Sequence, residues 1–101
     1  MIGTSRMAVL LAGLSAAIAG GASAADVEYG AYLSTQCVTC HRANVTVGAI
    51  PSISGLPTQY FVHALKEYRR GERRNPVMMS VAQALSDEDI EALAAYFEQA
   101  R

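Results

Sequence analysis

The chain has 101 residues with 8 basic and 9 acidic side chains, so its net charge is −1. A chain of this length is expected to form one small domain. Its mildly acidic net charge argues against nucleic-acid binding. A domain of this size buries a modest core and usually needs a disulfide, a metal or oligomerisation to be stable. The apolar fraction of 51% overstates that core, because residues 1–24 are rich in apolar side chains.

Residues 1–24 are organised like a secretory signal peptide. Arg6 gives a positive start, residues 7–19 are an almost unbroken run of small apolar side chains, and Ala22-Ser23-Ala24 is an A-x-A-like cleavage site. We therefore expect export across the inner membrane to the periplasm, and one mature domain over residues 25–101. The alternative is an uncleaved anchor, for which the apolar run is short. Cleavage would leave no stable membrane span.

The spacing of small and apolar side chains predicts a first helix over about residues 27–40. One face carries residues at steps of three and four: Val27, Gly30, Ala31, Ser34 and Cys37. A glycine inside a helix costs about 1 kcal/mol relative to alanine. Gly30 therefore indicates that another element passes close to the backbone there, unless it is tolerated near a frayed helix start.

The end of this helix carries Cys37-Val38-Thr39-Cys40-His41, the C-x-x-C-H pattern of covalent c-type haem attachment. Residues three apart face the same way in a helical turn, so both thiols can form thioethers with the two haem vinyl groups. His41 then lies beside the anchored edge and can reach the iron. A thioredoxin-like redox pair, half of a zinc site and a disulfide are the alternatives. No strand pattern supports the first, and the mature chain has one further histidine and no further cysteine for the second.

Residues 42–56 are predicted to be a loop, because glycine and proline interrupt a run of β-branched side chains. A short strand fits this segment, but a sheet does not. Pro51 and Ile53 follow His41 closely enough to fold back against a haem face, although ordinary loop packing would place them there too.

A second helix is predicted from Pro57, a favourable first helical residue, to Gly71, a favourable C-terminal stop. Its apolar stripe contains Tyr60, Phe61, Ala64, Leu65 and Tyr68. His63 falls opposite this stripe, so we interpret it as a surface histidine rather than a second iron ligand. Five basic residues cluster at the end of the helix and could steer an acidic partner or simply be solvated: Lys66, Arg69, Arg70, Arg73 and Arg74.

The third predicted helix begins with a capping box of Ser86 and Asp89. Leu85 and Ile90 occupy the two positions of a hydrophobic staple around that cap. Apolar side chains then recur at i, i+3, i+4 and i+7 to give a core face: Ile90, Leu93, Ala94 and Phe97.

Between the second and third helices lie Met78 and Met79, the only methionines after residue 24. A neutral thioether is a good sixth ligand for haem iron and raises its reduction potential. Two methionines shortly after Pro76 look like a ligand loop. The alternative is that one or both fill space in the core.

Together these motifs resemble small class I c-type cytochromes. The resemblance is strongest to the single-haem domains of di-haem periplasmic cytochromes and to the cytochrome subunit of flavocytochrome c sulfide dehydrogenase. It covers essentially the whole mature chain and rests on five segments: Cys37–His41, Pro51–Gly55, Tyr60–Gly71 with Arg73, Leu85–Ile90 and Leu93–Tyr96. The sequence departs from this family at Arg42, where the family usually has glycine after the haem histidine. The turn there would then differ, or Arg42 would line the exposed haem edge.

The resemblance implies roles for particular residues. Its spacing makes Met78 the ligating methionine, with Met79 as the alternative. The family's proline packs on the haem histidine and its carbonyl accepts the ring N–H, which points to Pro51. The family's first and last helices cross at a glycine against an aromatic side chain, which matches Gly30 and Tyr96.

The resemblance also implies a fold and a function. The fold would be all-α, a small class I cytochrome c with three main helices around one covalent haem c. The protein would be a periplasmic one-electron carrier rather than an enzyme, with redox protein partners. One alternative is a tightly bound cytochrome subunit of a periplasmic dehydrogenase, such as a flavoprotein sulfide dehydrogenase. Another is a haem enzyme or sensor with an open iron site, which requires that neither methionine binds the iron.

Overall fold

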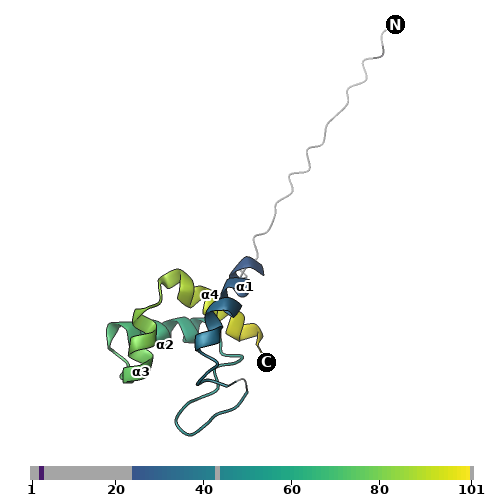
Figure 1. The fold of residues 1–101 in the computed structure, drawn as a ribbon. Coiled ribbons are helices and arrows are strands. Elements are labelled where there is room, and N and C mark those ends of the chain that lie inside the picture. Colours follow the sequence, from purple (N-terminus) through teal and green to yellow (C-terminus); the bar gives the residue numbers. More distant parts are fainter. Residues whose placement is uncertain (1–2, 4–23, 43, 101) are drawn as a thin grey trace.

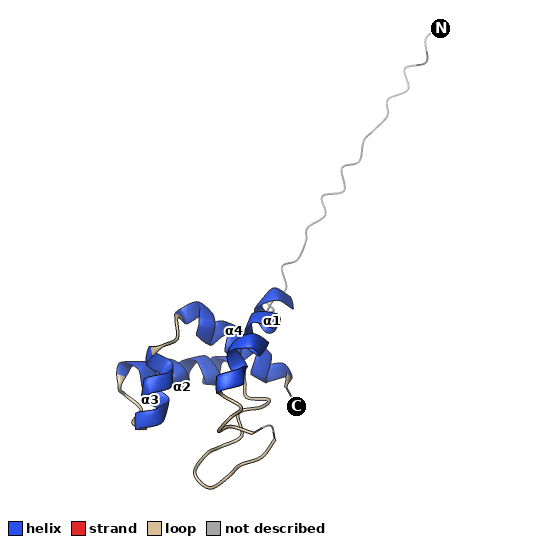
Figure 2. Cartoon of the chain, viewed as in Figure 1, coloured by secondary structure: helices blue, strands red, loops and turns tan. Residues whose placement is uncertain are grey.

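Four α-helices and one short 3₁₀ helix organise the described part of the chain, as the computed structural model shows (Figure 1). The structure describes Gly3, residues 24–42 and residues 44–100. The elements are α1 (Ala24–Leu33), η1 (Ser34–Gln36), α2 (Thr58–Arg70), α3 (Pro76–Gln83) and α4 (Asp87–Gln99). Helices and loops account for all of this part of the chain in Figure 2. The all-α fold class is confirmed.

The signal peptide prediction concerns residues that lie almost entirely outside the described part of the chain. Its cleavage therefore stays a prediction. Among the described residues, none of the helices combines the length and the apolar character that a membrane crossing requires.

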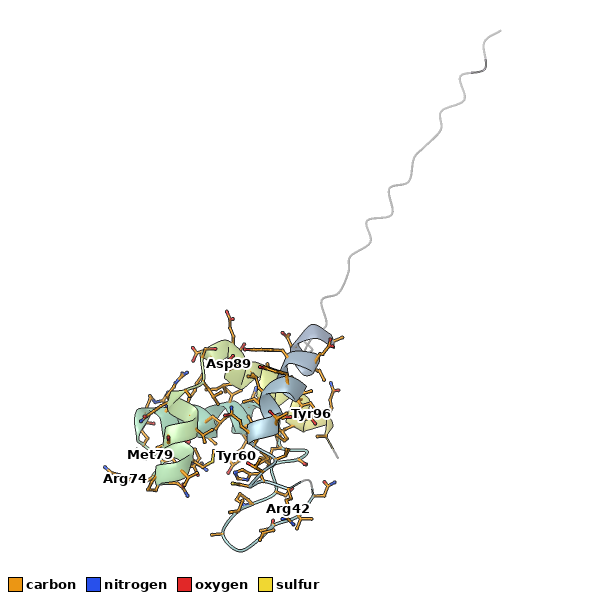
Figure 3. The ribbon with its side chains drawn as sticks, in the orientation of Figure 1. Arg42, Tyr60, Arg74, Met79, Asp89 and Tyr96 are labelled. Atoms are coloured by element: carbon orange, nitrogen blue, oxygen red, sulfur yellow. The ribbon has the colours of Figure 1, made fainter. Side chains whose placement is uncertain are left out.

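The crossing of α1 and α4 is built around Gly30. A Cβ atom on Gly30 would lie 2.1 Å from the carbonyl oxygen of Ala92 and 2.8 Å from the Cβ of Tyr96. Tyr96 lies where the two helices cross (Figure 3). Only glycine permits so close an approach without a shift of the backbone. The prediction that another element passes close to Gly30 is therefore confirmed, and so is its pairing with Tyr96.

The core is centred on one face of α4. Ile90, Leu93, Ala94 and Phe97 are all buried, as their spacing predicts. They pack against side chains from α2, α3 and the following turn: Phe61, Leu65, Ala82 and Leu85. The rings of Phe61 and Phe97 stack with their centroids 5.6 Å apart. The burial of Leu85 and Ile90 confirms the two staple positions.

Helix α2 ends where the sequence predicts and begins one residue later. Gly71 adopts a left-handed conformation with φ of 79°, and its N–H donates to the carbonyls of Glu67 and Tyr68. Pro57 has an extended ψ of 136° and stands just outside the helix. Its carbonyl accepts the Phe61 N–H at 3.1 Å, so it serves as the flanking residue rather than the first helical one.

The first helix is shorter than predicted. Helix α1 ends at Leu33, and the chain continues through η1 and a turn rather than as one α-helix to residue 40. Hydroxyl groups explain the change, because Ser34 donates to the Ala31 carbonyl at 2.6 Å and Thr35 to the Tyr32 carbonyl at 3.1 Å. Such bonds to the preceding turn compete with helical hydrogen bonds and bend the chain.

The segment with the two methionines is a helix, not the loop that the sequence suggested. Pro76 is the first residue of α3 rather than a stop signal. The side-chain oxygen of Asn75 accepts the N–H groups of Val77 at 3.1 Å and Met78 at 3.0 Å, which caps the helix. The three predicted helices are thus joined by a fourth, short one.

The capping box of α4 is present and is tied to α1. The Asp89 N–H donates to the Ser86 hydroxyl at 3.1 Å, and the Ser86 N–H donates to the Asp89 carboxylate at 3.0 Å. The Tyr29 hydroxyl also donates to Asp89, at 2.7 Å. These hydrogen bonds, that of Tyr29 first, lower the pKa of Asp89.

A lowered pKa makes Asp89 a source of acid sensitivity. Its contribution to stability is fully present above the ordinary aspartate pKa of about 3.9 and is lost as the pH falls through the lower folded value. We expect Asp89→Asn to lower the free energy of unfolding by about 0.5 kcal/mol near pH 7, because it removes a carboxylate from the positive end of the helix dipole. Urea unfolding at several pH values should show this difference shrinking toward about pH 2. Glu91→Gln, which changes an exposed carboxylate on the same helix, is the control; an equal response in both variants would contradict the assignment.

Candidate functional site

A cavity of about 340 Å³ opens between the turn after η1, the loop before α2, and helices α2 and α3. Its walls are mostly apolar and reach into the core. They include Ile53, Leu56, Phe61, Leu65, Val81, Leu85 and Leu93. Its volume lies within the range of small-molecule and cofactor sites.

Cys37 and Cys40 both line this cavity, as two separate thiols rather than a disulfide. The N–H of Val38 donates to the Ser34 carbonyl at 3.0 Å and that of His41 to the Cys37 carbonyl at 2.8 Å, so this turn stays helical. That geometry brings the two cysteines to the same wall.

Burial raises the pKa of the Cys37 thiol to about 11. Redox-active cysteine pairs depend on a lowered thiol pKa, because the thiolate is the nucleophile. The environment of Cys37 therefore argues against the thioredoxin-like alternative. Within residues 24–42 and 44–100, no three His, Cys, Asp or Glu side chains lie together as a metal site would need.

His41 lies on the same wall and is held by the loop. Its Nδ1 is 2.7 Å from the Pro51 carbonyl oxygen. A carbonyl oxygen can only accept a hydrogen bond, so Nδ1 carries a proton, and in the neutral ring Nε2 is the nitrogen with the lone pair. Imidazoles that bind metals are commonly oriented in this way through their other nitrogen. His41 is therefore a candidate ligand for a group bound in the cavity.

The two methionines have different surroundings. Met78 is half-buried, lines the cavity and packs against the core. Met79 is not among the lining residues; its terminal methyl lies 3.8 Å from where a Cβ on Gly71 would stand. Met79 therefore packs near Gly71 at the end of α2, while the thioether of Met78 is a candidate donor to a group in the cavity.

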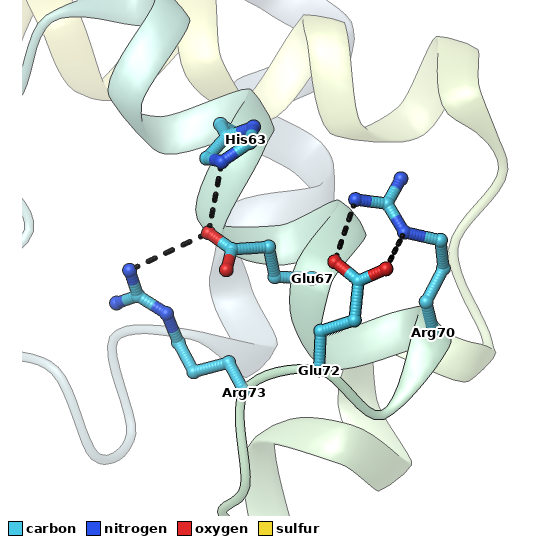
Figure 4. Close-up of polar contacts among 5 residues, drawn as sticks. All are labelled: His63, Glu67, Arg70, Glu72 and Arg73. Atoms are coloured by element: carbon cyan, nitrogen blue, oxygen red, sulfur yellow. Dashed lines mark hydrogen bonds and ion pairs between the residues drawn. The ribbon is translucent and has the colours of Figure 1, made fainter.

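His63 lies outside the cavity, as its helical phase predicts. Its side chain is 70% exposed and its Nε2 is 3.1 Å from the Glu67 carboxylate (Figure 4). Arg42 is exposed and is not a cavity-lining residue.

The basic cluster at the end of α2 is partly paired within the chain. Arg69 donates to the Leu85 carbonyl at 3.0 Å and to the Asp87 carboxylate. Arg70 is bound to Glu72 at 3.1 Å (Figure 4). Such pairing reduces the positive charge that this surface offers to a partner.

Sequence reasoning missed the part that Arg73 plays in the cavity wall. Its guanidinium carbon lies 5.8 Å from the ring centroid of Tyr60 and 5.5 Å from that of Tyr68. All three residues line the cavity. The apolar stripe of α2 already contained the two tyrosines, but Arg73 follows Gly71 and carries no helical phase that could have placed it.

The residues of this cavity fit a covalent haem. Two thiols, an imidazole with a free Nε2 and a thioether line one apolar space, and imidazole with thioether is the donor pair of many c-type haems. An all-helical domain with these groups is a haem-binding domain. The comparison with known families agrees, because residues 27–101 match the cytochrome c family. The chain belongs to this family of electron-transfer proteins that carry haem c.

Individual relatives are identical to the chain at about a third of the positions of the aligned segment. It is 38% identical over 65 residues to the thiosulfate dehydrogenase electron acceptor of Stutzerimonas stutzeri (strain A1501), which covers 61% of this chain and 30% of that protein. It is 36% identical over 84 residues to cytochrome c-554(548) of Halomonas halodenitrificans, with 78% of this chain and 95% of that protein covered.

A third relative is the cytochrome subunit of sulfide dehydrogenase of Chlorobaculum tepidum. The chain is 35% identical to it over 69 residues, which covers 67% of this chain and 63% of the subunit. In contrast, the chain spans about a third of the length of the thiosulfate dehydrogenase electron acceptors.

Proposed function

We propose that this protein is a one-electron carrier whose haem c is bound to Cys37 and Cys40 and whose iron is held by His41 and Met78. The observation that carries the proposal is the convergence of these four side chains on one apolar cavity. When bound, the haem supplies an iron that alternates between the ferrous and ferric states. His41 and Met78 would together hold the iron, and a substrate would then have no place to bind it.

Each residue has a distinct part in this proposal. The thiols of Cys37 and Cys40 bind the cofactor covalently. The Pro51 carbonyl fixes the ring of His41 by the 2.7 Å hydrogen bond, which aims Nε2 into the cavity and makes it a better donor. The Asn75 cap sets the start of α3 and thereby the direction of Met78.

We further propose that the mature protein is residues 25–101 in the periplasm, exchanging electrons with other redox proteins. The relative named as an electron acceptor of thiosulfate dehydrogenase suggests a dehydrogenase as electron donor. Electron transfer would take place where the cavity opens to solvent.

A second candidate function is a tightly bound cytochrome subunit of a dehydrogenase, such as a flavoprotein that oxidises sulfide. Exposed apolar side chains among the lining residues favour it, since Val77 is 64% exposed and Tyr60 is 52% exposed. Gel filtration of the protein purified from its source decides between the two. A flavin-containing chain that co-elutes supports the subunit, and a single small species supports the free carrier.

The haem and its ligands are tested by a pyridine haemochrome spectrum combined with two methionine variants. The spectrum should show one haem per chain with both of its vinyl groups saturated. The haem should also stay attached to the chain when the protein is denatured. We expect Met78→Ala to abolish the weak long-wavelength absorption of methionine-bound ferric haem. It should also lower the reduction potential by at least about 59 mV, a tenfold change in a one-electron equilibrium.

Met79→Ala is the matched control, because it removes the neighbouring thioether from the same helix. It should keep the absorption and the potential while losing some stability. The reverse result would move the ligand to Met79. Loss of the absorption in neither variant would mean that the two methionines can replace each other as the ligand. Its absence from the parent protein would indicate that neither methionine binds the iron, and would favour an open iron site and a haem enzyme or sensor instead.

A further inference from the structure

Two tyrosines form an exposed aromatic surface on α1, apart from the cavity. Tyr32 is 73% exposed and Tyr29 is 45% exposed. Their rings stack, with the centroids 6.5 Å apart and the planes 17° from parallel. Among the described residues of α1 and α4, only Leu93 lines the cavity. The proposed haem site therefore does not explain why these adjoining rings face solvent.

The aromatic surface is held in place by the start of α4. The Tyr29 hydroxyl donates to the Asp89 carboxylate at 2.7 Å. Asp89 is itself fixed by the capping box that it forms with Ser86. A ring held in this way loses little freedom when a partner binds. Tyrosine is among the residues that contribute most to protein–protein contacts, so this surface is suited to another protein.

The charge around the two rings is negative. Of the nine acidic residues of the chain, two lie on α1 and five on α4, and neither helix carries a lysine or an arginine. Glu28 is exposed next to Tyr29 on α1, and Glu88 is exposed in the first turn of α4. Hydrogen bonding to Asp89 chiefly, with the nearby Glu88 charge in addition, raises the pKa of the Tyr29 hydroxyl. A partner with positive side chains would complement this surface.

The chain itself shows which cation such a set of groups holds. The guanidinium carbon of Arg73 lies 5.8 Å from the ring centroid of Tyr60 and 5.5 Å from that of Tyr68. One of its nitrogens lies 3.6 Å from the Glu67 carboxylate (Figure 4). Arginine combines stacking on aromatic faces with planar hydrogen bonding to carboxylates, whereas lysine offers a compact, strongly hydrated charge. The exposed tyrosines and glutamates of α1 and α4 offer the same kinds of group to a partner.

We propose that this aromatic surface is a docking site for a partner protein that presents arginine side chains. The site consists of Glu28, Tyr29 and Tyr32 from α1 and Glu88 from α4. Guanidinium groups of the partner stack on the two rings and pair with the two carboxylates. Because the site lies apart from the cavity, a partner bound there leaves the cavity open for electron exchange. The inference therefore goes beyond the proposed function.

The test compares two synthetic peptides, pentaarginine and pentalysine, as probes of the haem-containing protein. Isothermal titration calorimetry at low ionic strength gives the two dissociation constants. The peptides carry the same charge, so a surface that acts through charge alone binds them equally. Stacking on the tyrosine rings should make pentaarginine bind at least about threefold more tightly. Its binding should change the NMR chemical shifts of Glu28, Tyr32 and Glu88.

Two variants of Tyr32 separate the aromatic ring from its apolar area. Tyr32→Leu should remove the preference for pentaarginine, whereas Tyr32→Phe, which keeps a ring, should retain it. Glu28→Gln and Glu88→Gln should each weaken the binding of both peptides about twofold. Glu98→Gln is the matched control, because it removes the same charge at the far end of α4, where the carboxylate accepts from the Thr58 hydroxyl. It should leave both affinities nearly unchanged.

Four results would contradict the proposal. The first is equal affinity of the parent protein for the two peptides. The second is a preference for pentaarginine that persists in Tyr32→Leu. The third is an equal loss of affinity in Glu98→Gln and Glu28→Gln, which would indicate a diffuse charge effect. The fourth is a dimer in sedimentation that forms without peptide and is lost in Tyr32→Leu, because the occupant would then be a second copy of this chain.

Discussion

Replacing Cys37 and Cys40 together by alanine is expected to leave a chain that does not fold cooperatively. The cavity of about 340 Å³ reaches to the core residues of α2 and α4, so a missing haem leaves that core open. The cavity opens to solvent, so without the haem its apolar walls would face water, at a cost of about 25 cal/mol for each Å² of apolar surface exposed. Small domains have a total stability of only about 5–15 kcal/mol. Loss of the haem therefore removes a large part of the contacts that stabilise this fold.

Far-UV circular dichroism during urea unfolding measures this effect. The double variant should show a low helix signal and a broad, non-cooperative change, whereas the parent should show one steep transition. The single variants Cys37→Ala and Cys40→Ala each keep one thioether. Their helix signal and the steepness of their unfolding should lie between those of the double variant and the parent. His63→Ala, which changes an exposed residue outside the cavity, should resemble the parent. A steep transition in the double variant would show that the helices carry the fold without the cofactor.

The sequence was a good guide wherever a local signal acts alone. Gly71 ends α2 because a left-handed residue satisfies the last carbonyls of that helix, whatever packs around it. Ser86 and Asp89 start α4 by hydrogen bonds within one turn. The core face of α4 followed from its period, since a single stripe of large apolar side chains has only one way to be buried.

Predictions were less accurate where one residue type favours two different local structures. Pro76 suggests the end of a helix as readily as its first residue, and the capping oxygen of Asn75 decides for the latter. The predicted first helix is too long at its C-terminal end. The hydroxyl groups of Ser34 and Thr35 compete with helical hydrogen bonds, and this leaves no trace in the spacing of apolar residues.

Some residues of the candidate site could likewise be predicted from the sequence, and others could not. The cysteines and the histidine of C-x-x-C-H lie within one turn, so their spacing alone implied a common cofactor. Met78 and Met79 are adjacent, and their different surroundings depend on how α3 packs against α2, which is a tertiary property. Arg73 joins the cavity through contacts with Tyr60 and Tyr68, which no periodicity in the sequence reveals.

Gly30→Ala is expected to destabilise the protein although alanine is the better helix former. The new Cβ would lie 2.1 Å from the Ala92 carbonyl oxygen, in a contact between two helix backbones that cannot be relieved by turning a side chain. Forcing extra volume into such a contact costs about 1–3 kcal/mol, and the helix propensity of alanine offsets about 1 kcal/mol of it. With a cost near 3 kcal/mol, the upper end of that range, and the offset of about 1 kcal/mol, we expect a net loss of about 2 kcal/mol. Urea unfolding of the haem-containing protein measures it.

Glu28 provides the matched control, because it is an exposed residue of the same helix. Comparing alanine with glycine at both positions separates helix propensity from the close approach of α4. At position 28, alanine should be more stable than glycine by about 1 kcal/mol. At position 30 the order should invert, since only there does the methyl group meet the backbone of Ala92. The same order at both positions would mean that α1 and α4 do not cross at Gly30 in solution, and the direction in which η1 presents Cys37 to the cavity would have to be reconsidered.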